Sequence, residues 1–560
     1  MRRLHGVVYF LLLCCLTSRA QTTVADIFGR TLNTRGITLV DWDGFMANPL
    51  LKFYIYAPTN AALPGSATLT ANGARIYFDA NSTVSSNGPT KTISLTSTSI
   101  GVPIRMSIFP DRDSASEEYT LTIVFTASNS IKQTNTVPIH VIDQDRQRTN
   151  AFMTTVNFDK DATGFFTNAS RRALVQQAAD DWCYFFTNMG TAKVSINAEQ
   201  TFIWSNNFDG GYYVRNTNAY TGYQLYAYGT TNSTHRSGGE ASYAGGVQTS
   251  NGVALKIKRS GGFEAEIYGN YNTRGWLFLT NESDWLATGN LGAETNDFYS
   301  IAHHEIGHAL IFNEAHPGFN TARTNGAFTS AAVTNYFGGI VPIDTSDHLN
   351  GSIDPESGQG SFGYEYYGSI PRKRWVMTKL DLLCAQEVGY TLRDVSALAA
   401  LTWTNTALTP AYVGIDYSNA LSATGGIVVY VWDVVSGTLP PGMTLDSFSG
   451  ALVGTPTSSG TFSFDVRVRD YHENQPGVTQ TINFVVSPPP ALQLSLFNNG
   501  AQPRILVAGT TGQHQTIEGS GNLSNWFTLT TNATGTNLFE FNDPDGWQSP
   551  TRFYRALVVP

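Results

Sequence analysis

Residues 298–310 read Phe-Tyr-Ser-Ile-Ala-His-His-Glu-Ile-Gly-His-Ala-Leu, and they constrain the structure more than any other stretch of this chain. Apolar side chains recur there at every fourth position, at Phe298, Ala302, Ile306 and Leu310. That spacing predicts an α-helix with one buried face. Thr295, Asn296 and Asp297 precede it, and each can cap the free backbone N–H groups of the first turn.

The polar residues of this helix form the motif His304-Glu305-Ile306-Gly307-His308. Because residues four apart share one face of a helix, His304 and His308 can bind the same Zn²⁺ ion. Glu305 lies one step round the helix, where its carboxylate can take a proton from a water that the zinc activates. The alternative is a chance motif without a metal. The helical periodicity and the five histidines between residues 303 and 348 argue against that alternative.

A catalytic zinc usually has three protein ligands and keeps one position for water. Three residues downstream of the motif could supply the third ligand: Glu314, His316 and His348. His316 stands in an Ala-His-Pro-Gly turn and could equally be an exposed loop residue. We expect His303, the neighbour of His304, to be an exposed residue on the helix surface.

The composition favours an extracellular protein with several domains. A chain of 560 residues is too long for one hydrophobic core. Charged residues make up 14% of the chain, whereas typical soluble proteins have about 25%. The net charge of -9, without a basic run in the mature chain, argues against nucleic acid as a partner.

Residues 1–20 have the features of a secretory signal peptide. Arg2 and Arg3 precede an apolar run at residues 7–16, and Ser18-Arg19-Ala20 resembles a cleavage site. This run is too short to span a membrane, and no other apolar stretch is long enough. We therefore expect a secreted protein, extracellular, periplasmic or at the cell surface, with no transmembrane segment in the mature chain.

Cleavage after Ala20 leaves two cysteines, Cys183 and Cys384, each within a predicted helix. An even pair in an exported protein can form a disulfide. Two buried free thiols are equally compatible with the sequence.

Residues 21–149 are predicted to form an all-β domain, because short alternating runs are separated by Gly, Pro, Asn and Ser turns. The run at residues 137–145, Val-Pro-Ile-His-Val-Ile-Asp-Gln-Asp, resembles the last strand of Calx-β and related immunoglobulin-like modules. Asp143 and Asp145 could bind Ca²⁺, although the solvated end of a strand is the favoured interpretation.

Residues 150–395 have a different pattern and are predicted to form one α+β domain. A helix is expected within residues 168–186, followed by a Gly-, Tyr- and Asn-rich β region, the helix with the two histidines and a long loop. A last helix begins near Thr378, where Thr378 and Asp381 form part of a capping box, and it ends at Gly389.

Residues 396–487 are predicted to form another β-sandwich. Their Leu-Pro-Pro-Gly turn at residues 439–442 and Gly-Thr-Pro turn at residues 454–456 resemble those of immunoglobulin-like modules of bacterial surface proteins. Three prolines then form a stiff linker. Residues 491–560 are predicted to be a further small β domain.

The stretch from Tyr299 to Leu310 resembles the active-site helix of the metzincins, zinc peptidases with the extended motif HExxHxxGxxH. Ile311 stands where that family has a glycine, and Glu314 stands where it has the third histidine. A β-branched residue does not readily adopt the left-handed conformation that the glycine permits. The close-spaced third ligand of the family is therefore disfavoured here.

A metzincin branch that includes leishmanolysin places the third histidine far downstream, past an inserted segment. Residues 327–349 look like that arrangement, which implies that His348 is the third zinc ligand, with Glu314 and His316 as alternatives. The family also has a methionine in a turn beneath the zinc, and Met377 is the candidate for it. The alternative is that Met377 is simply a core residue.

A thermolysin-like enzyme would instead take its third ligand from a glutamate on a later helix, and Glu387 has such a position. Tyr366 or Tyr367 could assist catalysis. The Gly-Tyr ending of the last helix and the loop with His348 both favour the metzincin-like arrangement over the thermolysin-like one.

The resulting prediction is a multidomain protein in which an α+β zincin catalytic domain, metzincin-like, is flanked by all-β immunoglobulin-like sandwich domains. The resemblance implies a secreted zinc-dependent endopeptidase that binds one catalytic Zn²⁺ and cleaves protein or peptide substrates. The alternative is a surface adhesin or glycan-binding protein that carries an inactive zincin domain. In both cases the β domains allow contacts with a cell surface or matrix.

Overall fold

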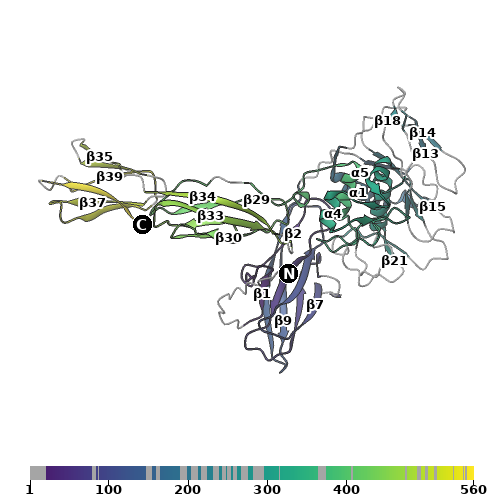
Figure 1. Ribbon diagram of the computed structural model, residues 1–560, viewed down its shortest axis with the longest axis horizontal. Coiled ribbons are helices and arrows are strands. Elements are labelled where there is room, and N and C mark those ends of the chain that lie inside the picture. Colours follow the sequence, from purple (N-terminus) through teal and green to yellow (C-terminus); the bar gives the residue numbers. More distant parts are fainter. Residues whose placement is uncertain are drawn as a thin grey trace, which may run out of the picture. The chain divides into compact units, whose positions relative to one another are not determined.

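The computed structural model forms two compact units, Met1–Leu398 (unit 1) and Ala399–Pro560 (unit 2) (Figure 1). The predicted signal peptide lies outside the described residues. The described residues are 21–78, 83–85, 88–146, 154–158, 164–188, 199–202, 212–215, 223–230, 239–241, 247–248, 254–255, 262–266, 275–281, 295–314, 316–363, 374–404, 408–472, 476–488, 493–498, 502–509, 514–533, 535–546, 548 and 551–559.

Two β-sheets build the first part of unit 1, drawn in purple and dark blue in Figure 1. Their strand orders are β1-β3-β8-β5 and β2-β10-β9-β4-β7-β6. Fully and partly buried residues alternate along β3, as expected of a strand with one face in a core. The predicted all-β character of this part is confirmed. Its strands are β1 (Thr23–Asp26), β2 (Ile37–Asp41), β3 (Leu51–Tyr56), β4 (Gly65–Ala71), β5 (Ile76–Phe78), β6 (Thr83–Ser85), β7 (Gly88–Leu95), β8 (Val102–Ile108), β9 (Glu118–Thr126) and β10 (Lys132–Asp143).

A mixed sheet in the order β11-β15-β19-β16 follows. Strands β11 (Thr154–Asn157), β15 (Tyr223–Thr230) and β19 (Gly262–Glu266) run parallel. Strand β16 (Gly239–Ala241) pairs antiparallel with β19 and forms the edge of the sheet. Shorter strands in this region are β12 (Phe186–Asn188), β13 (Glu199–Phe202), β14 (Tyr212–Arg215), β17 (Val247–Gln248), β18 (Ala254–Leu255), β20 (Gly275–Leu277) and β21 (Thr295–Asp297).

Two long helices, α1 (Ala169–Tyr184) and α2 (Phe298–Leu310), begin after the capping residues Asn168 and Asp297, and Asp297 is one of the three caps predicted for α2. The Asn168 side chain accepts hydrogen bonds from two backbone N–H groups at the start of α1. Asp297 caps α2 in the same way, and the predicted apolar face of α2 is buried. Helix α1 lies beside β11 and α2, and α2 lies beside β16 and β19. Among the described residues, no helix has both the length and the apolar character needed to cross a membrane.

The chain beyond α2 folds into short elements and a long loop at residues 343–363. It ends in α5, which begins with the complete capping box of Thr378 and Asp381 and stops at Gly389, as predicted. The elements of this part are α3 (Pro317–Ala322), β22 (Arg323–Thr324), β23 (Ala327–Phe328), α4 (Ala331–Phe337), β24 (Val341–Pro342), α5 (Lys379–Val388), β25 (Thr391–Leu392) and a 3-10 helix at Ser396–Leu398. Another 3-10 helix, Phe165–Thr167, precedes α1.

The sequence predicts a domain boundary at residue 149, yet the residues on both sides of it belong to one compact unit. The loop between β2 and β3 is one reason. Its residues Trp42, Phe45 and Met46 have no exposed surface, and Met46 forms a β-bridge with Met377 just before α5. The loop could leave the helices only by exposing these apolar side chains to water.

Cys183 and Cys384 are not joined by a disulfide, so the bond that the sequence allows does not form. Cys183 lies on α1, which packs on α2, whereas Cys384 lies on α5, which packs on α3 and α4. Both side chains are buried. Burial and the nearby carboxylates of Asp381 and Glu387 raise the pKa of the Cys384 thiol well above its ordinary value. That thiol therefore stays protonated and unreactive.

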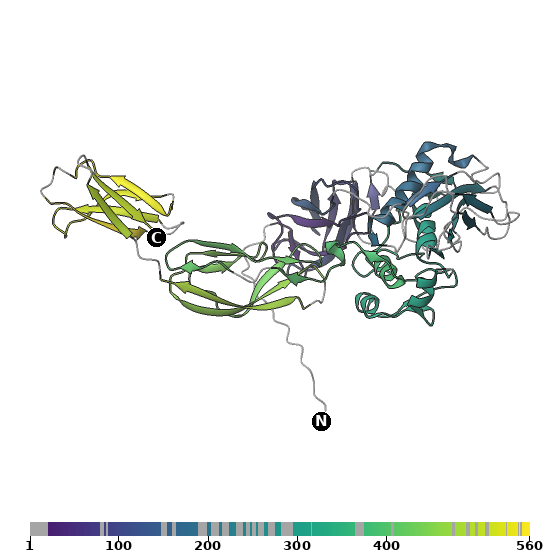
Figure 2. The same ribbon diagram turned by 90° about the horizontal axis from the view of Figure 1, so that it is seen from above.

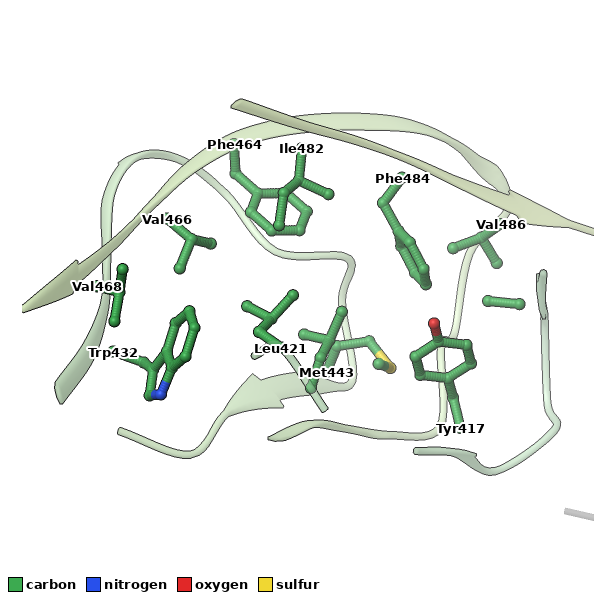
Figure 3. Close-up of a cluster of buried hydrophobic side chains, with 12 residues drawn as sticks. Tyr417, Leu421, Trp432, Met443, Phe464, Val466, Val468, Ile482, Phe484 and Val486 are labelled. Carbon is green, nitrogen blue, oxygen red and sulfur yellow. The ribbon is translucent and has the colours of Figure 1, made fainter. Parts of the chain in front are cut away.

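Unit 2 begins with a β-sandwich whose sheets have the orders β27-β34-β33-β30 and β28-β32-β31. Twelve buried side chains, Trp432 among them, fill the space between these sheets (Figure 3). The strands are β26 (Thr402–Trp403), β27 (Ala411–Tyr412), β28 (Tyr417–Ala420), β29 (Ala423–Thr424), β30 (Val431–Gly437), β31 (Met443–Leu445), β32 (Ala451–Gly454), β33 (Gly460–Arg469) and β34 (Val478–Ser487).

The last module of unit 2 has two three-stranded sheets, β35-β36-β39 and β38-β37-β40 (Figure 2). Ile505, Val507 and Ile517 are fully buried at its centre. The strands are β35 (Gln493–Asn498), β36 (Pro503–Ala508), β37 (His514–Ser520), β38 (Phe527–Asn532), β39 (Leu538–Asn542) and β40 (Phe553–Val559).

Replacing Trp432 by alanine should destabilise the sandwich of unit 2 without affecting unit 1. The change leaves a cavity in the core and should cost about 3–5 kcal/mol of the free energy of unfolding. In differential scanning calorimetry we expect a lower unfolding temperature for this sandwich and an unchanged transition for unit 1. Val485→Ala is the matched control, because Val485 is 54% exposed on β34. Equal shifts in the two variants would contradict the assigned core.

Candidate metal centre

Three histidines from two parts of unit 1 meet at one place. His304 and His308 lie four residues apart on α2, and His348 lies in the loop after β24. One nitrogen of each ring lies within 4.8 Å of those of the other two. Among the described residues, neither Glu314 nor His316 belongs to this group. The structure therefore brings together the three residues that the resemblance selects.

The rings of His308 and His348 present their Nε2 atoms to each other at a distance of 3.1 Å. His308 Nδ1 donates to the carbonyl oxygen of Phe312 at 2.7 Å, so its proton lies on Nδ1. His348 Nδ1 lies 3.3 Å from Asp344 Oδ2, and the backbone N–H of His348 donates to Asp344 Oδ1 at 3.0 Å. Such partners of Nδ1 favour the tautomer in which Nε2 is the acceptor, as in histidines that bind metals.

Burial keeps the histidines of α2 neutral. It lowers the pKa of His308 to about 4, an effect that the nearby His348 increases and the Phe312 carbonyl opposes. Burial, with the neighbouring histidines, lowers the pKa of His304 well below its ordinary value. A metal binds only the neutral imidazole, so these rings need lose no proton at neutral pH to accept one. Glu305 is also buried, at 4% exposure, beside His304.

Phe362 forms an apolar platform against the two rings of α2. Its ring is nearly parallel to that of His304, with centroids 4.6 Å apart and an interplanar angle of 7°. It meets the His308 ring edge-on at 4.7 Å. The Phe362 ring also lies near the rings of Phe312, Trp375 and His348. No sequence motif marked Phe362, because the loop that carries it reaches α2 only in the folded chain.

Two glycines permit this close packing. A Cβ atom on Gly307 would collide with the Phe362 ring, and a Cβ atom on Gly363 would collide with the His348 ring. The Phe362 backbone N–H donates to Asp381 Oδ1 at 2.8 Å. Asp381 is fully buried and also caps α5. The carboxylate that starts the last helix therefore also fixes the platform beneath the histidines.

The first turn of α2 is held by the segment just before α5. Arg374, which is 1% exposed, donates to both oxygens of Asp297 at 2.9 and 3.0 Å. Asp297 is at the same time the N-cap of α2. The Trp375 backbone N–H donates to Ser300 Oγ at 2.7 Å. These contacts fix where α2 begins.

The prediction that His303 is exposed is wrong. It has no exposed surface and lies among Trp182, Tyr299 and Trp375, with ring centroids 5.2, 5.3 and 5.0 Å away. Burial lowers its pKa to about 3. Because α2 is covered on more than one side, a position next to the apolar stripe is also buried.

Glu314 and His316 take part in local contacts instead of the histidine group. Glu314 Oε1 accepts from Arg323 Nη2 at 2.9 Å at the surface. His316 is the N-cap of α3, and its Nδ1 accepts from the N–H of Gly318 at 3.0 Å. Among the described residues, both alternative third ligands therefore lie outside the group of His304, His308 and His348. Glu387, on α5, also lies outside the histidine group.

Met377 is fully buried just before α5, and its carbonyl oxygen accepts from the Ala47 N–H at 2.8 Å. A methionine turn beneath a metal stays a prediction for this residue. The aromatic ring that stacks on His304 belongs to Phe362. Tyr366 and Tyr367 lie outside the described residues.

The residues considered for Ca²⁺ have different environments. Asp143 lies with Asp111 and Asp113, one carboxylate oxygen of each within 4.8 Å of the others. Asp145 instead accepts a hydrogen bond from the Gly44 N–H at 2.6 Å. Binding of Ca²⁺ stays a prediction, and only Asp143 of the two predicted residues belongs to the carboxylate cluster.

Residues 397–487 match the family model described as "Putative Ig domain". An immunoglobulin-like module was predicted for residues 396–487, and this part of the prediction is confirmed. The module is compatible with an extracellular location and with contacts at a cell surface. No curated protein matches the chain.

Several solved structures are similar to parts of the chain. A "putative alpha-galactosidase" from Bacteroides fragilis has 21% identity over 15% of this chain and 17% of its own, with a TM-score of 0.13. The C-terminal domain of the Streptococcus agalactiae AgI/II polypeptide BspA has 10% identity over 24% of this chain and 57% of its own, with a TM-score of 0.15. The protocadherin GammaB4 extracellular domain has 9% identity over 86% and 69%, with a TM-score of 0.16. TM-scores this low support no conclusion about fold or function.

Replacing Phe362 by alanine should weaken metal binding. The variant loses the ring that orients His304 and His308, and losing such a supporting contact typically costs 10–100-fold in metal affinity. Zinc affinity, measured by competition with a chromophoric chelator, is expected to fall by about tenfold or more. Phe362→Leu keeps an apolar side chain, so its zinc affinity should lie between those of the wild-type protein and Phe362→Ala. A folded Phe362→Ala protein with unchanged zinc affinity would contradict the platform role.

Proposed function

We propose that the chain is a secreted zinc-dependent endopeptidase whose α+β domain is of the zincin, metzincin-like type. One observation carries the proposal: two buried imidazoles and one half-buried imidazole converge beside a glutamate on the same helix as two of them. His304, Glu305 and His308 supply the helix part of that site, and His348 supplies the part from the loop.

The donor set suits zinc. Catalytic zinc sites commonly use three neutral nitrogen ligands and leave a fourth position open. The 3.1 Å between His308 Nε2 and His348 Nε2 gives two acceptor nitrogens that face one point. A cation placed at that point would be bound by both nitrogens. His304, His308 and His348 would therefore hold one Zn²⁺.

When bound, zinc lowers the pKa of water toward neutrality and polarises a carbonyl group. Glu305 supplies the proton transfer. Its carboxylate accepts a proton from the water that attacks the scissile carbonyl carbon, and later gives that proton to the leaving amine. Asp344 keeps the His348 ring in place, and Phe362 keeps the rings of α2 in place.

The sheet offers a place for an extended peptide. Strand β16 is the edge of the β11-β15-β19-β16 sheet and lies beside α2. An edge strand has unpaired backbone groups that can bind an extended chain as an added strand. A peptide bound along β16 would pass next to the helix that carries Glu305, which favours cleavage within a chain.

Replacing Glu305 by glutamine should abolish hydrolysis and leave zinc bound. The variant keeps the shape of the side chain and loses the proton acceptor, and general-base catalysis contributes typically about 100- to 10,000-fold. The measurements are zinc content by atomic absorption and the cleavage rate of casein or gelatin. Full activity in Glu305→Gln with bound zinc would refute this mechanism.

The rival function is a surface adhesin or glycan-binding protein that carries an inactive zincin domain. The immunoglobulin-like match at residues 397–487 favours contacts of this kind. The two functions are compatible in one chain, because the module and the histidines lie in different units.

Metal removal separates the two functions. A zinc peptidase should lose casein cleavage on treatment with 1,10-phenanthroline and regain it when zinc is restored. An adhesin without peptidase activity should show neither stoichiometric zinc nor cleavage that chelators inhibit. His348→Ala is the matched variant: it removes one ligand, and its zinc content and cleavage rate should both fall.

A further inference from the structure

The two sheets of β1 to β10 form the N-terminal β-sandwich, and one of its loops packs against α2. The loop between β2 and β3 places the Phe45 ring edge-on against that of Tyr299, with centroids 5.7 Å apart. Tyr299 lies in the first turn of α2. The same loop donates a backbone hydrogen bond from Ala47 to the Met377 carbonyl oxygen. The sandwich therefore contacts both the helix with the two histidines and the segment before α5.

Arg112, from the segment after β8, joins the sandwich to α1 and α2 at once. Its Nε and Nη2 atoms donate to the two oxygens of Asp181 at 3.1 and 2.6 Å. Its guanidinium carbon lies 3.6 Å from the Phe45 ring centroid and 5.5 Å from that of Tyr299. A planar guanidinium that binds both oxygens of one carboxylate fixes orientation as well as charge.

Asp181, on α1, connects Arg112 to Tyr299 of α2. Its side chain has no exposed surface, and its Oδ2 also accepts from the Tyr299 hydroxyl at 2.5 Å. Breaking a buried ion pair leaves an uncompensated charge, which is strongly unfavourable. Arg112 thus compensates the Asp181 carboxylate on one side while Tyr299 donates to it on the other.

Tyr299 stands five residues before His304 on the same helix. Its ring stacks on that of His303 with centroids 5.3 Å apart. Trp182, next to Asp181 on α1, donates from its indole nitrogen to the His303 carbonyl oxygen at 2.8 Å. Two adjacent residues of α1, Asp181 and Trp182, therefore hold α2 at Tyr299 and at His303, just before His304.

We infer that the N-terminal β-sandwich is a permanent part of the metal-binding unit, with Arg112 as a positioning residue for α2. The sandwich is therefore not an inhibitory segment that must leave before the site can work. This inference rests on the proposed function, because it gives Arg112 a role in placing the zinc ligands on α2.

Arg112→Ala and Arg112→Lys in the full chain test the role of Arg112. We expect Arg112→Ala to weaken zinc binding by about tenfold or more and to change the visible absorption spectrum of the Co²⁺-substituted protein. Arg112→Lys keeps the charge without the planar fork and should recover part of both properties. Arg105→Ala is the matched control, because Arg105 is an exposed residue on β8 of the same sandwich. A folded Arg112→Ala protein with wild-type zinc affinity and Co²⁺ spectrum would overturn the inference.

Tyr299→Phe keeps the test usable where Arg112→Ala fails to fold. It removes only the hydroxyl that donates to Asp181 and retains the ring against Phe45 and His303. A measurable rise in the zinc dissociation constant and a shifted Co²⁺ spectrum are expected. Wild-type values for both would contradict the role of the Arg112–Asp181–Tyr299 contacts in positioning α2.

Cleavage of the full chain tests permanence directly. A specific protease site is inserted between residues 149 and 150, and the protein is cut after purification. The two pieces are expected to elute together in gel filtration with zinc content and casein cleavage unchanged. Release of the N-terminal piece from a remainder that keeps its zinc and is equally or more active would overturn the inference.

These readouts also separate this inference from the proposed function. A wild-type protein that binds zinc without cleaving peptides would refute the peptidase, while the zinc and Co²⁺ measurements on Arg112 would still decide the positioning role. If the wild-type protein cleaves peptides and Arg112→Ala leaves its zinc affinity unchanged, only the inference is refuted.

Discussion

Helix α2 can bring its histidines to one point because its neighbours leave it little freedom to move. Arg374 fixes its first turn through Asp297, and Trp182 binds the carbonyl of His303 in its middle. Phe362 packs against the face that carries His304 and His308, at a distance that only Gly307 permits. A preorganised metal site holds its ligands in position before the metal binds, as the proposed zinc site would require. The packing of α2 meets that requirement.

Three carboxylates, two buried and one half-buried, hold these segments together. Asp297, Asp381 and Asp181 each serve two elements: a helix cap and an arginine, a helix cap and the Phe362 backbone, or an arginine and a tyrosine. A buried charge is costly unless it is paired or hydrogen-bonded. Each of these residues therefore joins two segments that could not move apart without leaving it unsatisfied. The same reasoning explains why the N-terminal sandwich and the helices form one unit.

Local patterns predicted local structure well. The four-residue spacing of apolar side chains gave the correct helix, and Asp297, Thr378 and Gly389 mark helix ends because caps depend on neighbouring backbone groups. The immunoglobulin-like module was recognisable from its turns. The buried environment of His303 and the role of Phe362 were not predictable in this way. Both depend on segments far away in the chain, such as Trp182 and the loop at residues 343–363.

The sequence by itself determined that His304, Glu305 and His308 share a helix, because hydrogen bonds four residues apart set the period of that helix. It also made His348 one of three candidates for the third position. Only the tertiary structure placed the His348 ring next to that of His308 and sent Glu314 and His316 elsewhere. The reason is physical: a helix repeats locally, whereas the path of a loop is decided by what it packs against. Here the loop is fixed by the contacts of Phe362 and Gly363 with α2 and His348, and by the hydrogen bond from Phe362 to Asp381.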